Sequence, residues 1–283
     1  MSYRTILVNL NEILHVRNLL ETTASIARKA DAYVIGLYVI PAVDLYISSE
    51  VDVLPVEDDR QRLLFEKHEA AIRSAFDSII VKDGIRGEFR VVDAPDPRIA
   101  PTVVEHAREA DLVVIGQSAS ASNRAIGSSF SEQVVIASGR PTLVVPPPNG
   151  RAVAPNNLAI VGWNGSRESA RAVFDSIPLL KQCDEVLLAQ IGPEPEKGDA
   201  GGSPSAADVR LAKALARHDI DARAIDLHTS REAGEVLLER AESRCASLLV
   251  MGAYGHTRLR EFILGGATRS VLRGMKCPVL FSH

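Results

Sequence analysis

An internal repeat constrains the fold of this chain more than any other feature. Three segments of the first half align with three of the second, because each pair shares its pattern of apolar residues, glycine and proline. The aligned pairs are TILVNLNE (5–12) with LAIVGWNGS (158–166), ADLVVIG (110–116) with ASLLVMG (246–252), and RPTLVVP (140–146) with CPVLFS (277–282). The sequence therefore predicts two copies of one structural unit joined head to tail.

The two copies differ in length and are joined by a short linker. Asn11 and Gly116 are 105 positions apart in the first copy, against 88 for the aligned Asn164 and Gly252, so the first copy is 17 residues longer. We place this insertion near residues 41–59. The junction PPPNGRAVAP (146–155) is rich in residues that interrupt helices and strands, as linkers are. We predict domains at residues 1–147 and 155–283.

Each copy alternates between strand-like and helix-like segments. Runs such as LLVMG are apolar without alternation, which is typical of parallel strands buried on both faces. Such alternation predicts a doubly wound α/β domain with right-handed crossovers, which binds ligands beyond the carboxyl ends of its strands. In the second copy we expect strands at Leu158–Gly162, Glu185–Ile191, Asp221–Leu227, Leu248–Gly252 and Val279–Phe281, and helices near Arg167–Leu180, Ala206–Arg217, Glu232–Arg244 and Ala267–Arg273.

Composition fits two globular domains. The chain has 283 residues, of which 46% are hydrophobic, and its net charge of −4 gives no general attraction to nucleic acid or to an anionic membrane. Its start lacks a signal-peptide pattern, and no apolar stretch approaches the roughly 18 residues of a membrane span. The three cysteines include no CxxC pair, which argues against a disulfide framework and a structural zinc site. We expect a cytoplasmic protein without nucleic-acid or membrane partners.

A glycine pattern in the second copy points to phosphate binding. In VMGAYGHTRLREFILGGATRSVL (250–272), Gly252 ends a buried strand, Gly255 follows, and Gly265 and Gly266 precede a helix-like segment. Glycine lets the backbone approach a ligand closely, and the N–H groups at a helix N-terminus suit phosphate. The Thr268 hydroxyl could donate to a phosphate or help to hold a metal. Positive charge could come from His256, Arg258 and Arg260.

This pattern resembles that of the universal stress protein family. Nucleotide-binding members of that family carry Gly-x2-Gly-x9-Gly-[Ser/Thr] after the fourth strand. Gly252, Gly255 and Gly265 match this motif in type and spacing, whereas Gly266 stands where Ser or Thr is usual. The resemblance covers essentially the whole chain as a tandem pair of such domains, and it includes the GWNGS turn and the Pro-Val final strand.

The resemblance implies a five-stranded parallel sheet of order 3-2-1-4-5 with helices on both faces in each copy. It also implies ATP, with Mg²⁺ as a possible counter-ion, as the ligand of the second copy. The turn after the first strand would touch the adenosine, and Asn164 stands where the family often has Asp. The implied nucleotide-binding residues are Gly162, Trp163, Asn164, Met251, Gly252, Tyr254, Gly255, Gly265, Gly266, Ala267 and Thr268.

The resemblance further implies pairing through the final strands. The fifth strand of the family commonly pairs with a partner domain, so Leu143–Val145 and Val279–Phe281 would pair and make each chain a pseudo-dimer. Homodimer formation beyond this is an open expectation.

The first copy matches the glycine motif less well. Gly116 is present, but Ala119 stands where the second glycine belongs. Gly116 and Gly127 are 11 positions apart, against 13 for the corresponding pair in the second copy, although Gly127-Ser128-Ser129 keeps the Gly-Ser form. A shorter loop with a Cβ at a close-approach position should hold a triphosphate poorly. We therefore expect one competent site per chain.

Simpler interpretations stand beside these assignments. The glycines could merely shape a strand-to-helix turn, Asn164 could belong to a helix-capping turn with Ser166, and Trp163 could pack beside that turn. The seven histidines show no metal-ligand spacing. The segment Gly116–Ser120 (GQSAS) lacks the last glycine of a G-x-S-x-G nucleophile elbow, which argues against an esterase.

Three functional hypotheses follow. The first is a tandem universal stress protein that binds ATP in its C-terminal domain and acts as a nucleotide-dependent regulator in the stress response. The sequence offers no general base beside the loop, so any ATP turnover should be slow. The second is a non-enzymatic interaction module whose nucleotide sites are vestigial. The third is an adenylyl-transferring ligase, which would need an SGGxD-type loop that neither VNLNE nor VGWNGS supplies.

Overall fold

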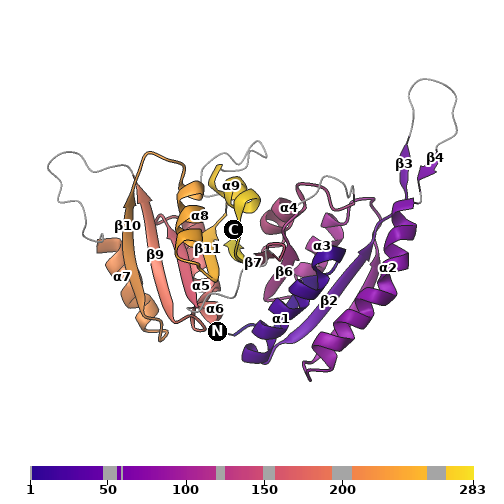
Figure 1. The fold of residues 1–283 in the computed structure, drawn as a ribbon, viewed down its shortest axis with the longest axis horizontal. Helices are drawn as coiled ribbons and strands as arrows, with labels where there is room; N and C mark the ends of the chain where they lie inside the picture. Colours follow the sequence, from indigo (N-terminus) through magenta and orange to yellow (C-terminus); the bar gives the residue numbers. More distant parts are fainter. Residues whose placement is uncertain are drawn as a thin grey trace. The chain divides into compact units, whose positions relative to one another are not determined.

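The fold consists of two compact α/β units, which Figure 1 shows as a ribbon. The computed structural model describes residues 2–46, 56–58, 60–118, 125–148, 157–192, 206–253 and 266–283. Contacts between Cα atoms divide the chain into an N-terminal unit, Tyr3–Ser138, and a C-terminal unit that contains Gly139–His283.

The N-terminal unit is built on four parallel strands. They lie in the order β5-β2-β1-β6, with Thr5 opposite Tyr33 and Ile6 opposite Leu112. Apolar residues without alternation form β1 and β6, and both strands are almost wholly buried, as the sequence pattern predicts. The strands are β1 (Thr5–Asn9), β2 (Tyr33–Ile40), β5 (Gly87–Asp93) and β6 (Leu112–Gly116). The helices are α1 (Val16–Ala30), α2 (Arg60–Phe76), α3 (Ala100–Ala107) and α4 (Phe130–Ala137), with short turns η1 (Ile13–His15) and η2 (Asp77–Val81).

A separate two-stranded sheet lies within the insertion predicted near residues 41–59. Strands β3 (Asp44–Tyr46) and β4 (Val56–Asp58) pair antiparallel, with Asp44 opposite Asp58. The extra residues of the first copy thus follow β2 and precede the long helix α2.

The C-terminal unit has the strand order β10-β9-β8-β11-β12-β7. Its first five members in this order follow the predicted 3-2-1-4-5 arrangement, and all their pairings are parallel. The strands are β7 (Thr142–Val145), β8 (Leu158–Trp163), β9 (Glu185–Gly192), β10 (Ala222–His228), β11 (Leu248–Gly252) and β12 (Val279–Ser282). The helices are α5 (Arg167–Asp175), α6 (Ile177–Leu180), α7 (Ala206–Ala216), α8 (Ala233–Ser243) and α9 (Gly266–Gly274).

Strand β7 joins this sheet although it belongs to the first copy in sequence. It pairs antiparallel with β12, with Leu143 opposite Leu280 and Val144 opposite Val279. The two strands expected to pair therefore do so. The compact unit begins at Gly139 for this reason, whereas the domain boundary at residue 147 follows the repeat and stays a prediction.

The predicted single helix Arg167–Leu180 is wrong. The structure has α5 and α6 in its place, separated at Ser176, whose φ and ψ are −86° and −7°. Pro178 lies in the first turn of α6. Proline has no backbone N–H and its ring collides with the carbonyl of the preceding turn, which kinks or breaks a helix and accounts for the interruption here.

Candidate functional site

The carboxyl ends of β8 and β11 meet where the strand order of the C-terminal unit reverses. The chain runs from β8 to β9 and β10 on one side, and then returns to β11 on the other side of β8. The two strands are parallel, and Met251 lies opposite Gly162. Trp163 and Gly252 therefore end neighbouring strands at one edge of the sheet. Open α/β sheets bind their ligands at this edge.

The two glycines at these strand ends accommodate helices. A Cβ on Gly162 would lie 2.9 Å from Cδ1 of Leu237 in α8. A Cβ on Gly252 would lie 2.5 Å from the carbonyl carbon of Glu168 and 2.6 Å from the backbone nitrogen of Ser169, both in α5. Packing against the α5 backbone thus requires glycine at position 252, whereas at position 162 the end of the Leu237 side chain would have to shift. The interpretation that glycines shape the local structure applies to these two residues.

The same glycines show how the helices are layered. Met251 and Gly162 are direct partners in register, so their side-chain directions share a face, and Gly252 points to the other face. Gly162 faces α8 and Gly252 faces α5. These helices therefore cover opposite faces of the sheet, as a doubly wound fold requires.

Asn164 lies in the turn between β8 and α5 and is exposed. Its Oδ1 accepts a hydrogen bond from the backbone N–H of Ser166 at 3.1 Å, and Ser166 Oγ accepts one from the N–H of Ser169 at 3.1 Å. Ser166 is the N-cap of α5, so the predicted capping turn is confirmed. Trp163 beside it is half-buried.

The aligned residue Asn11 has a different role. Its side chain is 1% exposed, donates to the carbonyl of Val39 at 2.7 Å and accepts from the N–H of Val39 at 3.1 Å. It thus joins the turn after β1 to β2. The repeat predicted equivalent positions for Asn11 and Asn164, but the two amides form different contacts.

The start of α9 lies next to the start of α8. A Cβ on Gly234 would lie 2.6 Å from the carbonyl oxygen of Ala267 and 2.9 Å from its Cα. Gly266, the first residue of α9, is exposed, Ala267 is half-buried, and Thr268 is 2% exposed. The first turn of α9 contains no acidic residue, and its N–H groups have no partner within the helix. Backbone N–H groups so placed suit an anion.

Some predicted site residues lie outside the described residues. These are Tyr254, Gly255 and Gly265, together with the basic residues His256, Arg258 and Arg260. The structure therefore brings together Gly162, Trp163, Asn164, Met251 and Gly252 at the ends of β8 and β11, and places Gly266, Ala267 and Thr268 in the first turn of α9.

The corresponding strand end in the N-terminal unit is covered by side chains. A Cβ on Gly116 would lie 3.2 Å from Cγ of Glu12 and 3.8 Å from Nδ1 of His15. Burial raises the pKa of the Glu12 carboxyl above its ordinary value and lowers the pKa of the His15 imidazole. His15 Nδ1 is buried and has no hydrogen-bond partner in the described part of the chain. Sequence reasoning missed both residues, although Glu12 directly follows the aligned Asn11.

A serine pair also closes this strand end. Ser131, in the first turn of α4, donates from Oγ to the carbonyl of Gly116 at 3.2 Å, and the hydroxyls of Ser131 and Ser118 lie 2.9 Å apart. The backbone N–H of Ser118 also donates to Ser131 Oγ at 3.2 Å. The segments before and after the first copy's loop are thus tied together by short contacts.

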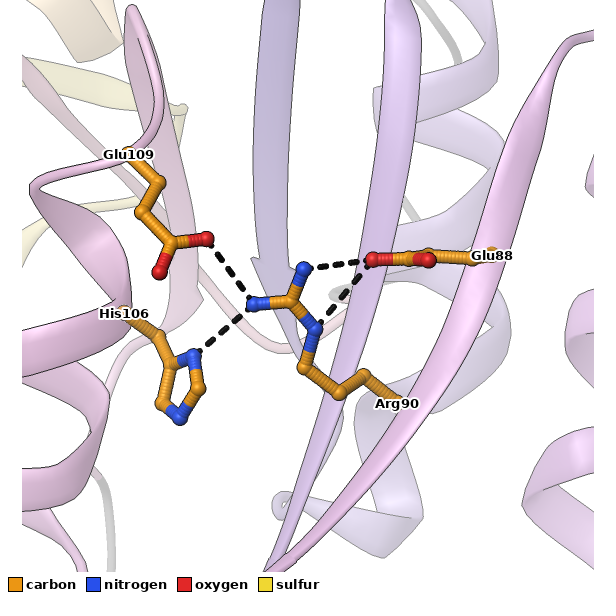
Figure 2. Close-up of polar contacts among 4 residues, drawn as sticks. All are labelled: Glu88, Arg90, His106 and Glu109. Atoms are coloured by element: carbon orange, nitrogen blue, oxygen red, sulfur yellow. Dashed lines mark hydrogen bonds and ion pairs between the residues drawn. The ribbon is translucent and has the colours of Figure 1, made fainter.

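A further polar cluster lies at the opposite end of the N-terminal sheet. Figure 2 shows the Arg90 guanidinium between Glu88 of β5 and the pair His106 and Glu109. Arg90 donates to Glu88 Oε1 at 2.5 Å, to Glu109 Oε2 at 3.0 Å and to His106 Nδ1 at 2.9 Å. These residues lie near the beginning of β5 and the end of α3, away from the carboxyl edge. The cluster joins β5 to α3 and is part of the scaffold.

The described ranges contain no group of three or more His, Cys, Asp or Glu residues that could hold a metal ion. None of their helices is both long and apolar enough to cross a membrane.

Comparisons with known proteins match the chain to one family. The model of the "Universal stress protein family" matches residues 2–146 and 159–283. A universal stress protein of Synechocystis sp. is 42% identical over 48 residues, so the match spans only 17% of this chain and 17% of that protein. A universal stress protein from Archaeoglobus fulgidus has a similar fold, with a TM-score of 0.69 at 17% identity over 98% of this chain and 97% of that one. A universal stress protein solved in complex with cAMP is 22% identical, covers 45% of this chain and 97% of its own, and has a TM-score of 0.38.

Proposed function

Because the chain belongs to the universal stress protein family, we propose that its C-terminal unit binds an adenine nucleotide, ATP, and that occupancy regulates a response to stress. The observation that carries this proposal is the meeting of β8 and β11 at the reversal of strand order, with Met251 opposite Gly162. A ligand at this edge reaches the turn after β8 and the chain that follows β11.

The proposed roles follow from where the described residues lie. Trp163 ends β8 and Asn164 lies in the turn beyond it, so both would contact the nucleoside, for which the exposed Asn164 amide retains hydrogen-bonding capacity. The backbone N–H groups of Gly266 and Ala267 would contact phosphate. Thr268 is buried, so its hydroxyl fits a metal ligand poorly, and Mg²⁺ would arrive bound to the phosphates.

We assign binding to the C-terminal unit because the equivalent strand end of the N-terminal unit is covered. The methylene carbons of Glu12 lie against Gly116, and the carboxyl group of the same side chain would repel the phosphates of a nucleotide when ionised. Ser131 bonds to the carbonyl of the same glycine. The N-terminal unit would then support the fold or the regulation, while β7 and β12 would link the two repeats. Homodimer formation and a cytoplasmic location belong to the same proposal.

Nucleotide binding is tested on the intact purified chain. Denaturing the protein and analysing the released small molecules should yield an adenine nucleotide, and calorimetric titration of the nucleotide-free chain should detect ATP binding. Gly255→Val should abolish the binding while leaving the urea unfolding midpoint close to that of the wild type. Neither released nucleotide nor measurable ATP binding would refute the proposal.

A second candidate is an interaction module with vestigial nucleotide sites. Two observations favour it: helix packing alone already requires glycine at Gly252, and Gly266 replaces the family's Ser or Thr. In this case Gly255→Val would leave the regulatory phenotype in cells unchanged. Loss of both ATP binding and that phenotype in the same variant would reject this alternative.

A further inference from the structure

Glu232, the residue before α8, places its carboxylate beside the first residue of α9. Its Oε1 lies 3.3 Å from the position that a Cβ would take on Gly266, and its Cδ lies 3.7 Å from that position. Glu232 is the N-cap of α8, with φ −66° and ψ 131°. The contact joins residues that are far apart in sequence, and no local motif predicts it.

The position of this contact is fixed by the backbone of the two helices. Gly234 lies two residues after Glu232, and its Cα approaches Ala267 so closely that a Cβ would overlap the backbone. The first turns of α8 and α9 therefore cannot move apart without losing this packing. The Glu232 carboxylate consequently stays within reach of Gly266.

This arrangement explains the departure at Gly266. A Ser or Thr side chain at this position would crowd the Glu232 carboxylate, because its Cβ would lie only 3.3 Å from Oε1. With glycine at position 266, a hydroxyl group that can donate to a phosphate is absent, and the nearby side-chain group is a negatively charged acceptor. The Glu232 carboxylate therefore opposes the preference for an anion that the backbone N–H groups of α9 give this end of the site.

The neighbouring cation does not neutralise Glu232. Arg231 forms ion pairs with Glu239 at 2.6 Å and with Glu235 at 3.8 Å. Among the described residues, no ion pair involves Glu232. Its charge therefore acts on whatever occupies the space before α9.

We propose that Glu232 gives the C-terminal site a charge selectivity: it disfavours uncomplexed polyphosphate and accepts adenosine, AMP or the divalent-cation complex of ATP. This inference rests on the proposed nucleotide binding at that site. The Glu232 carboxylate and the phosphates repel each other because both are negatively charged. A divalent cation bound by both groups would relieve this repulsion.

The test compares the wild type with Glu232→Gln and with the matched control Glu235→Gln. The control removes the same charge one turn into α8, from a side chain that is 57% exposed. Adenosine, AMP and ATP are titrated calorimetrically, first in EDTA and then in Mg²⁺. In EDTA, Glu232→Gln should tighten ATP about tenfold relative to AMP, as expected for a like charge removed at a few ångströms near a protein surface. The control should leave this ratio unchanged, and Mg²⁺ should remove most of the difference.

A second measurement separates this inference from the proposed function. Tripolyphosphate without a nucleoside is titrated while the backbone amide NMR signals of residues 266–268 are followed. A response in Glu232→Gln that is weaker or absent in the wild type supports the charge selectivity, even if no variant binds adenosine or AMP. An unchanged ATP-to-AMP ratio in Glu232→Gln, or the same tripolyphosphate response in both proteins, overturns it, even where adenine nucleotides bind.

Discussion

Replacing Gly252 by alanine should destabilise the C-terminal unit before it affects any ligand. The new Cβ would lie 2.5 Å from the carbonyl carbon of Glu168 and 2.6 Å from the nitrogen of Ser169. Both atoms are backbone of α5, so no side-chain rotation relieves the overlap. Restoring ordinary contact distances requires a shift of about 1 Å between α5 and β11.

The expected loss follows from two contributions. Overpacking of a well-packed interior costs about 1–3 kcal/mol, and a weakened N-cap bond between Ser166 and Ser169 adds about 1 kcal/mol. The free energy of unfolding of this unit should therefore fall by about 2–4 kcal/mol. A loss of this size is large against the 5–15 kcal/mol typical of a whole domain.

The assay uses the intrinsic fluorescence of Trp163, the single tryptophan of the chain, which ends β8 in the same unit. Urea unfolding of the full chain is followed for Gly252→Ala and for the control Gly192→Ala. Gly192 also ends a strand, and a Cβ there would meet nothing within 4 Å, so the control should change stability by less than about 0.5 kcal/mol.

The result also separates two reasons for a glycine at this position. A Gly252→Ala protein that unfolds like the wild type but binds nucleotide more weakly would refute the packing argument. Such a result would assign Gly252 to ligand contact instead. Destabilisation in the absence of any nucleotide would establish the packing role.

Three other substitutions test separate contacts. Gly234→Ala places a Cβ 2.6 Å from the carbonyl oxygen of Ala267, so it should cost about 1–3 kcal/mol and speed hydrogen exchange in α9; unchanged exchange would contradict this. Tyr38→Phe removes a buried hydroxyl that donates to a carbonyl of α2 at 2.7 Å, which should cost about 0.5–1.5 kcal/mol in urea unfolding, and an unaltered midpoint would count against it. Burial raises the pKa of Glu12 above 4.5, so the folded state binds this proton more tightly than the unfolded state, and stability declines as pH rises through the window above 4.5. Glu12→Gln should therefore stabilise the protein at pH 7 and not below pH 4.5, and equal stabilisation at both pH values would disprove the assignment.

Sequence reasoning succeeded where periodicity and local chemistry decide the structure. The apolar runs of β8 and β11 predicted buried parallel strands, and the resemblance predicted the strand order around them. The glycine at the end of β11 was identified, although its packing against α5 was not. The break at Pro178 was missed because the apolar periodicity continues through Ser176, while a proline in the chain removes the hydrogen bond that periodicity assumes.

The site was harder to predict because its important contacts join distant segments. Glu12 contacts Gly116, and Glu232 contacts Gly266, across more than thirty residues in each case. No local pattern specifies such pairs, since they depend on how the helices pack on the sheet. The aligned residues Asn11 and Asn164 also depend on tertiary packing. The Asn11 amide is buried against β2, whereas the Asn164 amide caps a turn.

Strands β7 and β12 pair in the finished fold but are synthesised at different times, because they lie far apart in the sequence. Translation completes Thr142–Val145 long before Val279–Ser282, and all four residues of β7 are buried in the finished fold. The edge of β7 that β12 later covers therefore stays open while the second half is made, as an apolar strand that other chains can extend. A chain truncated before Val279 should therefore aggregate, rather than behave as a stable first repeat without the second.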